Sequence, residues 1–257
     1  MRLLVLLFAL LMPIVAWMNQ QGVFGPTNGE ISDRYPTLVV AAGYAFAIWG
    51  LIFLLDIVYG AWQLTGERRR ERALTLAAMP AAAGFMLTTL WMPMFSMGFY
   101  WACLVIIFGA MACVVAAVRH VVRHGQPGRD RIALWALGLH AGWLSMAAFL
   151  NLAQVMVAEQ VLPTDRMLGW SLPLLGIAAA TLLAINHALR GLVPYVLAAL
   201  WALVAVYVKQ SGWDLPGSDA MAWAALAVAA LLLVQTLMLH RRRSTVGHVE
   251  PRHAMTQ

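Results

Sequence analysis

The chain has 257 residues, of which 62% are hydrophobic and 11% are charged. A composition this apolar cannot supply the polar surface of a soluble domain, so soluble enzymes and soluble binding modules are excluded. We therefore predict an all-α fold, a polytopic bundle of transmembrane helices.

Eight apolar segments have roughly the length that crosses a bilayer as a helix, about 20 residues. They run at about 3 to 18, 37 to 63, 73 to 92, 98 to 118, 132 to 158, 169 to 188, 192 to 208 and 221 to 240. We predict one transmembrane helix for each segment.

The basic residues predict how these helices are oriented. If the N-terminus is cytoplasmic, only Arg34, Arg166 and Lys209 of the 17 Lys and Arg residues lie outside, which leaves 14 inside. This is the asymmetry expected of a bacterial inner-membrane protein whose N- and C-termini are both cytoplasmic. The net charge of +6 thus indicates topology and contact with anionic lipid headgroups, and it does not indicate nucleic-acid binding.

The first apolar run, Leu3 to Trp17 after a single arginine, fits either a signal peptide or a membrane helix. No small-x-small cleavage site precedes the end of the run. This favours a helix that stays in the protein.

Residues 19–36 form the longest predicted external loop, and they contain Gly22, Gly25, Pro26 and an Asn-Gly pair at 28–29. The loop is either a solvated connector or a lid over a pocket. Eighteen residues with their own turn signals exceed what a connector requires, which favours the lid.

An acidic residue, Asp56, lies inside the second segment, where a charge costs about 2.5–3.5 kcal/mol on insertion scales. Asp56 and His140 each lie about eight residues from the cytoplasmic end of their helix. Equal depth makes them candidate partners and a candidate proton relay. The alternative is that Asp56 reaches towards Arg68 or Arg119 at the interface.

The fifth segment carries a polar and aromatic stripe at helical spacing. Its members are His140, Trp143, Ala147, Asn151 and Gln154. Amides in hydrocarbon need partners, so this stripe should face protein. The two amides are either contacts between helices, worth about 0.6–2 kcal/mol each, or part of a ligand pocket.

Three stretches resemble the TspO/MBR family of tryptophan-rich sensory or translocator proteins. Residues 143–151, WLSMAAFLN, resemble the family's fifth-helix pattern, roughly W-V-S-F-A-T-x-L-N. Residues 43–49, GYAFAIW, resemble the pattern that opens its second helix, with Ala41 and Ala42 in place of paired prolines and Phe46 and Trp49 one residue closer together. Its third-helix N-x-x-W is matched loosely at 88–91, where Thr88 replaces the asparagine.

This resemblance covers residues 1–160, which would form the family's five-helix bundle. The apolar segments predict three further transmembrane helices in residues 161–240, and the arginines after them predict a basic cytoplasmic tail at 241–257. The resemblance also implies a pocket for porphyrins, haem or sterol-like ligands beneath the first loop. The residues that it assigns to the pocket are Phe46, Trp49, Trp91, Trp143, Ala147 and Asn151. Trp49 and Trp143 lie roughly 22 and 17 Å from the cytoplasmic ends of their helices, near the midplane, where flat aromatic walls suit a flat apolar ligand.

We therefore predict a membrane-embedded binding or sensory protein for a hydrophobic, tetrapyrrole-like or sterol-like ligand. Two alternatives stay open: a secondary transporter that uses Asp56 and His140 as a proton relay, and an assembly or scaffold subunit. We assign no catalytic residue and no metal ligand, because no nucleophile motif, paired-Cys site or phosphate-binding loop is present in the sequence. The expected partners are the ligand and the lipid bilayer, with a homodimer left open and nucleic acid not expected.

Overall fold

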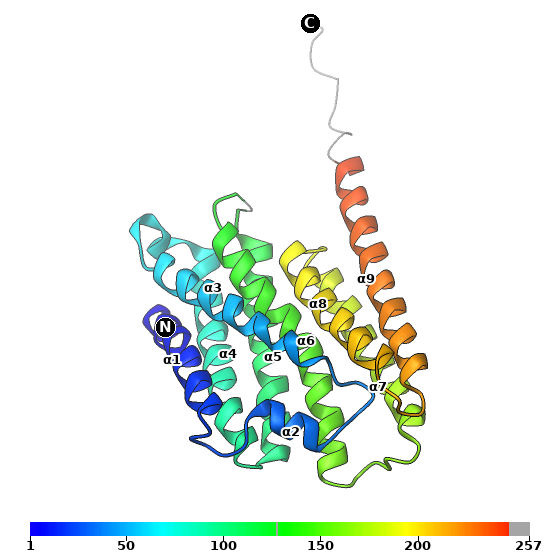
Figure 1. Ribbon diagram of the computed structural model, residues 1–257. Helices are drawn as coiled ribbons and strands as arrows, with labels where there is room; N and C mark the ends of the chain where they lie inside the picture. The colour runs from blue at the N-terminus through cyan, green and yellow to red at the C-terminus, as the bar shows by residue number, and fades with distance from the viewer. Residues whose placement is uncertain (127, 247–257) are drawn as a thin grey trace, which may run out of the picture.

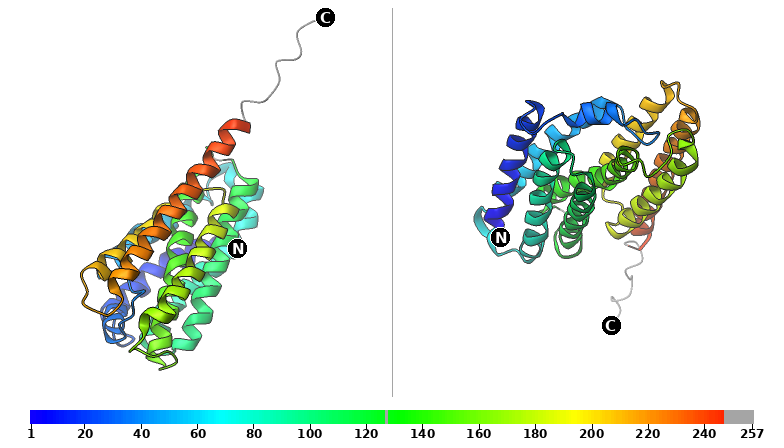
Figure 2. Two further views of the ribbon diagram at one scale, coloured as in Figure 1. Left: turned by 90° about the vertical axis from the view of Figure 1, so that its right-hand side faces the viewer. Right: turned by 90° about the horizontal axis from the view of Figure 1, so that it is seen from below.

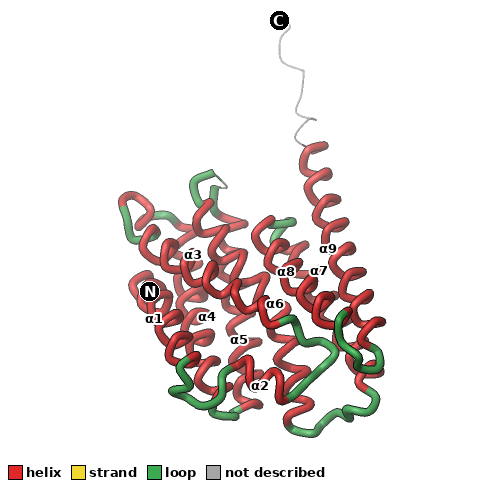
Figure 3. Tube along the Cα trace, in the orientation of Figure 1, coloured by secondary structure: helices red, strands yellow, loops and turns green. Residues whose placement is uncertain are grey.

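The computed structural model describes residues 1–126 and 128–246, and all the regular structure in these residues is helical (Figures 1 and 3). The long helices are α1 (Arg2–Gln20), α3 (Ile48–Trp62), α4 (Arg72–Ser96), α5 (Tyr100–His124), α6 (Arg131–Ala158), α7 (Met167–Ala188), α8 (Val193–Ser211) and α9 (Ser218–Val246). The short elements are α2 (Asn28–Arg34) and the 3₁₀ helices η1 (Gly43–Ala47) and η2 (Gly66–Arg70).

Eight of these helices are long and apolar enough to cross a membrane. Each lies on one of the eight segments picked out from the sequence, with η1 and α3 together making the second span. The prediction of an all-α bundle of about eight transmembrane helices is therefore confirmed.

The bundle has a central group of three helices, α4, α5 and α6. α1 packs against α4 and α3, while α8 packs against α6 and α9, and α7 packs against α9 and α6. Seen from below, α1 and the group α7–α9 lie on opposite sides of the central helices, and the chain between α1 and α3 passes from one side towards the other (Figure 2). This crossing segment contains α2 and covers one end of the bundle, which we call the α2 end (Figure 1).

The second transmembrane helix begins later than predicted. Residues 37–42 are not helical, η1 follows, and α3 starts at Ile48. The apolar run from Thr37 suggested a helix, but Ala42 N–H donates to the carbonyl of Ala205 on α8, at 2.9 Å. A backbone group bonded to another helix is not free to join a helical ladder, so tertiary contact overrides the apolar run.

The turn between the third and fourth spans is also shorter than predicted. α4 continues through Pro93 to Ser96, and only residues 97–99 separate it from α5. Proline is tolerated inside membrane helices because neighbouring groups satisfy the carbonyl that it frees. Trp91 is consequently a helical residue that faces the bundle and is buried.

The predicted long loop contains the helix α2, which begins with a capping box. The Thr27 side chain accepts from Glu30 N–H, and Glu30 accepts from Thr27 N–H at 2.7 Å. These hydrogen bonds hold the pKa of the Glu30 carboxyl below its usual value. A capping box satisfies two of the helix's orphan donors, so even this seven-residue helix has a defined start.

Two helix crossings are set by glycines that allow backbones to touch. A Cβ added at Gly142 on α6 would lie 2.2 Å from the carbonyl oxygen of Tyr195 on α8. One added at Gly84 on α4 would lie 2.5 Å from a methyl of Val114 on α5. Membrane helices usually associate by close approach at small residues. Lipid tails are as apolar as the side chains, so the hydrophobic effect does not drive the helices together and close packing must do so.

Candidate functional site

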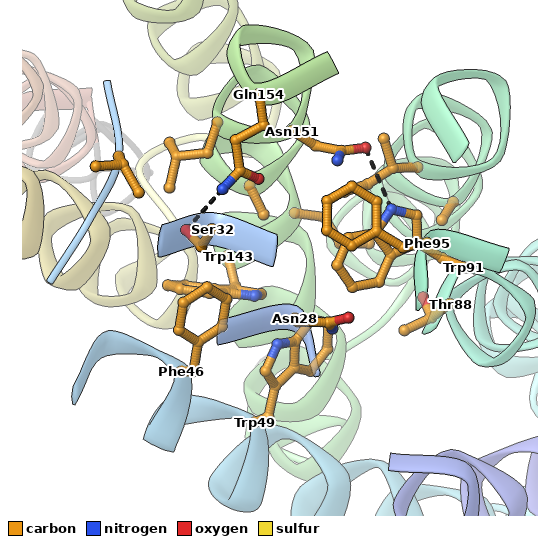
Figure 4. A pocket seen from close by; sticks show the side chains of 16 residues that line it. Asn28, Ser32, Phe46, Trp49, Thr88, Trp91, Phe95, Trp143, Asn151 and Gln154 are labelled. Atoms are coloured by element: carbon orange, nitrogen blue, oxygen red, sulfur yellow. Dashed lines mark hydrogen bonds between the residues drawn. The ribbon is translucent and has the colours of Figure 1, made fainter. Parts of the chain in front are cut away.

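A narrow cavity lies beneath α2, between α3, α4, α5 and α6, and we call it the inner cavity (Figure 4). Its volume is about 30 Å³. That is room for a water molecule and far too little for a drug-sized ligand. It is lined by Asn28, Ser32, Val40, Phe46, Trp49, Thr88, Trp91, Phe95, Ile107, Ala110, Trp143, Leu144, Ala147, Leu150, Asn151 and Gln154.

The inner cavity adjoins a larger hollow, which we call the vestibule, of about 500 Å³. α1, α2, η1, α3 and α4 supply most of its walls, and Lys209 and Trp213 border it from α8 and the chain beyond. The two hollows share six lining residues: Asn28, Ser32, Val40, Phe46, Trp49 and Trp91. They are therefore neighbouring parts of one site, and only the vestibule has the size of a ligand pocket.

All six residues that the family resemblance assigned to a pocket line the inner cavity. Phe46 and Trp49 each meet the ring of Trp143 edge-on, with centroids 6.1 and 6.0 Å apart. Trp91 Nε1–H donates to Asn151 Oδ1 at 3.2 Å. These aromatic groups fill the space by packing on one another, which is why so little volume is left.

Two buried donors on the wall of the inner cavity have no protein acceptor within the described residues. They are Trp143 Nε1 and Asn151 Nδ2, and the side chains that carry them are 1% and 2% exposed. A buried donor left without a partner costs about 1–3 kcal/mol. The inner cavity is therefore prepared to receive a hydrogen-bond acceptor, from a water molecule or from a ligand.

α2 is fastened over the inner cavity by a side-chain hydrogen bond. Gln154 Nε2 on α6 donates to Ser32 Oγ on α2 at 2.6 Å (Figure 4). Asn19 on α1 makes a second link, since its Nδ2 donates to Asn28 Oδ1 at 3.3 Å. The sequence marked Asn28 only as part of a turn signal, and nothing in it pointed to Ser32. The Thr-x-x-Glu pattern at 27–30, a capping-box signature, could have located their helix.

Asp56 and His140 are in contact on the side of the inner cavity that faces away from α2. His140 Nδ1 is 2.8 Å from Asp56 Oδ2, and both side chains are fully buried. The imidazole is held between aromatic rings, stacked on Phe85 at 5.4 Å and edge-on to Trp49 at 5.6 Å. The alternative, in which Asp56 reaches an interfacial arginine, does not describe this structure.

Thr88 links this pair to the inner cavity, because Thr88 lines the cavity and its hydroxyl oxygen lies 3.2 Å from His140 Nε2. The hydroxyl donates to the carbonyl of Gly84 at 2.9 Å, so it is left to accept from Nε2–H. One proton then remains for the contact between Nδ1 and Asp56. Whether it sits on nitrogen or on oxygen, the pair carries no net charge, as a low-dielectric interior requires.

The segment 37–47, which we call the strap, is bound to α8. Four hydrogen bonds join them: Ala42 N–H to Ala205 O at 2.9 Å, Trp201 Nε1–H to Ala45 O at 3.0 Å, and Gln210 Nε2 to Val40 O at 3.3 Å and Thr37 O at 3.5 Å. Because the strap carries Phe46, α8 helps to position a wall of the site. Helical periodicity does not indicate which helix lies beside the strap, so these contacts with α8 were not predicted from the sequence.

Comparison with known proteins places the chain in a family. The TSPO-like protein family model matches residues 2–238, a longer range than the 160 residues over which the sequence motifs suggested the resemblance. A search of curated proteins and a search of solved structures each returned no match. Because the match spans all eight transmembrane helices up to residue 238, the chain belongs to the TSPO-like protein family.

Proposed function

We propose that this protein binds a flat, hydrophobic ligand within the membrane, as a binding or sensory protein. A tetrapyrrole such as a porphyrin or haem, or a sterol-like molecule, is the ligand class that we propose. The observation that carries the proposal is a ligand-sized vestibule whose aromatic walls continue into a cavity with unpaired buried donors. Membership of the TSPO-like family supports it.

The walls of the site suit such a ligand in shape and polarity. Trp17, Phe46, Trp49, Phe53 and Trp91 all line the vestibule. Aromatic faces bury a large apolar area against a flat ring system at little conformational cost. An oxygen or nitrogen acceptor on the ligand can then take the hydrogen bonds that Trp143 and Asn151 leave open at the inner end.

Deeper entry of the ligand requires α2 to move. Gln154 and Ser32, which are hydrogen-bonded to each other, line the inner cavity, and the rings of Phe46, Trp49, Trp91 and Trp143 leave little space in it. A ligand ring that displaces these contacts would change the position of α2, and such a change at the surface is what a sensory protein can report. We propose that the α2 end is external and that both termini are cytoplasmic, in a bacterial inner membrane, because most of the arginines lie near the other end.

A substitution that fills the vestibule tests the binding site. Gly50 lines the vestibule, and a Cβ placed there meets nothing within 4 Å. We expect Gly50→Phe to raise the Kd for protoporphyrin about tenfold or more, because the added ring occupies the ligand's volume. The measurement is saturable quenching of tryptophan fluorescence in the purified protein.

Gly176→Phe is the matched control. Gly176 on α7 is exposed, and its added Cβ also meets nothing within 4 Å, but it lines neither hollow. We expect this variant to bind like the wild type. Absence of saturable quenching in the wild type, or an equal Kd in both variants, would refute a ligand site in the vestibule.

A second candidate function is proton-coupled transport of the same class of ligand. The observation that favours it is the continuous line from the inner cavity through Thr88 and His140 to Asp56. Buried ionisable pairs of this kind occur in membrane transporters as proton relays. Ligand-dependent acidification of proteoliposomes that Asp56→Asn abolishes would favour transport, whereas a binding protein moves no protons.

A further inference from the structure

We propose that Lys209 on α8 binds an acidic group of the ligand at the edge of the vestibule. The ligand would then be an amphiphile, with a flat apolar body and an anionic end. This inference rests on the proposed function and adds the chemical class of the ligand to it. It also gives the C-terminal helices a direct part in the binding site.

The position of Lys209 distinguishes it from the other basic residues. It is the only lysine in the sequence, and it lines the vestibule, whereas no arginine among the described residues lines either the vestibule or the inner cavity. Its ammonium lies over the ring of Trp213, 4.6 Å from the centroid. Trp213 lines the vestibule as well. The cation is therefore held at the cavity edge by an aromatic face and still has donors to offer.

Within the described residues Lys209 forms no ion pair. Asp33 also lines the vestibule, but it is exposed, whereas Lys209 is partly buried. Water screens an exposed carboxylate more strongly than a charge at a protein-lined edge. The α8 side of the vestibule therefore presents a positive charge that no carboxylate of the described residues pairs with, which favours an anionic group.

The backbone beneath Lys209 is fixed. The next residue, Gln210, is fully buried and donates to the carbonyls of Val40 and Thr37 in the strap. These bonds set the rotation of the last turn of α8 relative to the strap. Lys209 thus stands at a defined place relative to the strap, whose Ala41 and Gly43 line the same vestibule.

A pair of probes that share one ring system and differ at the two carboxyl ends tests the proposal. Protoporphyrin and its dimethyl ester share the apolar ring, but only the free acid carries carboxylates. We expect the wild type to bind the acid about threefold to tenfold more tightly than the ester, from one partly exposed charge-assisted contact. Lys209→Gln should abolish this preference by raising the Kd of the free acid while leaving the Kd of the ester unchanged. Lys209→Arg should keep most of the preference. Quenching in dodecyl maltoside avoids competition from phosphate headgroups.

The outcomes distinguish a failure of the role proposed for Lys209 from a failure of the proposed function. Arg166→Gln removes a charge from the loop before α7, outside both hollows, and should leave the preference intact. Saturable binding of both probes with equal Kd in the wild type overturns the role of Lys209 and leaves the proposed function standing. An acid preference that persists in Lys209→Gln also overturns it. Failure of both probes to bind overturns the proposed function and this inference together.

Discussion

We expect His140→Leu to lower the free energy of unfolding by about 3–5 kcal/mol, the usual cost of removing one partner of a buried ion pair. The substitution leaves the Asp56 carboxyl fully buried with no imidazole to share its proton. It also removes the hydrogen bond that His140 Nε2–H donates to the Thr88 hydroxyl oxygen. Unfolding by sodium dodecyl sulfate in mixed micelles, followed by far-ultraviolet circular dichroism, measures the change.

Two controls show whether the loss comes from the pair. The double variant Asp56→Leu, His140→Leu removes both polar groups, so it should recover a large part of the lost stability. His187→Leu makes the same change at an exposed histidine on α7 and should stay within about 0.5 kcal/mol of the wild type. A double variant no more stable than His140→Leu would contradict the pairing account.

Gly142→Ala should be the most damaging single methyl addition among the glycines of α6. The new Cβ would lie 2.2 Å from the Tyr195 carbonyl oxygen and 3.0 Å from Ala198 Cβ. Neither atom is the end of a flexible side chain, so α6 and α8 must separate. Overpacking of this kind costs about 1–3 kcal/mol. The same unfolding titration detects it, and ligand affinity should also fall because α8 holds the strap.

Gly176→Ala is the comparison for this prediction, because it adds the same methyl where nothing lies within 4 Å. Replacing a helical glycine that lacks such contacts by alanine raises the free energy of unfolding by about 0.5–1 kcal/mol. The two variants should therefore change stability in opposite directions. Equal effects would mean that the α6–α8 crossing is looser than the structure shows.

The sequence predicted those features of the site that follow from the geometry of one helix at a time, namely the face and the depth of each residue. Helical periodicity placed His140, Trp143 and Asn151 on one stripe, and equal depth suggested that Asp56 and His140 could meet. Both follow from the fixed rise and turn of an α-helix. The same reasoning placed the eight spans, because a bilayer selects for apolar length.

The parts that were missed depend on contacts between distant segments. Periodicity gives no information on which helix lies beside the strap, so the bonds from Trp201 and Gln210 could not be foreseen. The non-helical start of the second span has the same origin, since Ala42 is bonded to α8. Lys209 was visible as the only lysine, but its place at the vestibule depends on how α8 packs.

Protection of a thiol in the vestibule tests the central claim most directly. In a Cys113→Ala background, where the remaining Cys103 is buried, Gly50→Cys places a thiol on the vestibule wall and Gly176→Cys places one on the outer face of α7. We predict that protoporphyrin slows maleimide labelling at position 50, with the same Kd as the quenching titration, and leaves position 176 unchanged. Labelling at position 50 that is unaffected by saturating ligand would contradict a ligand site in the vestibule.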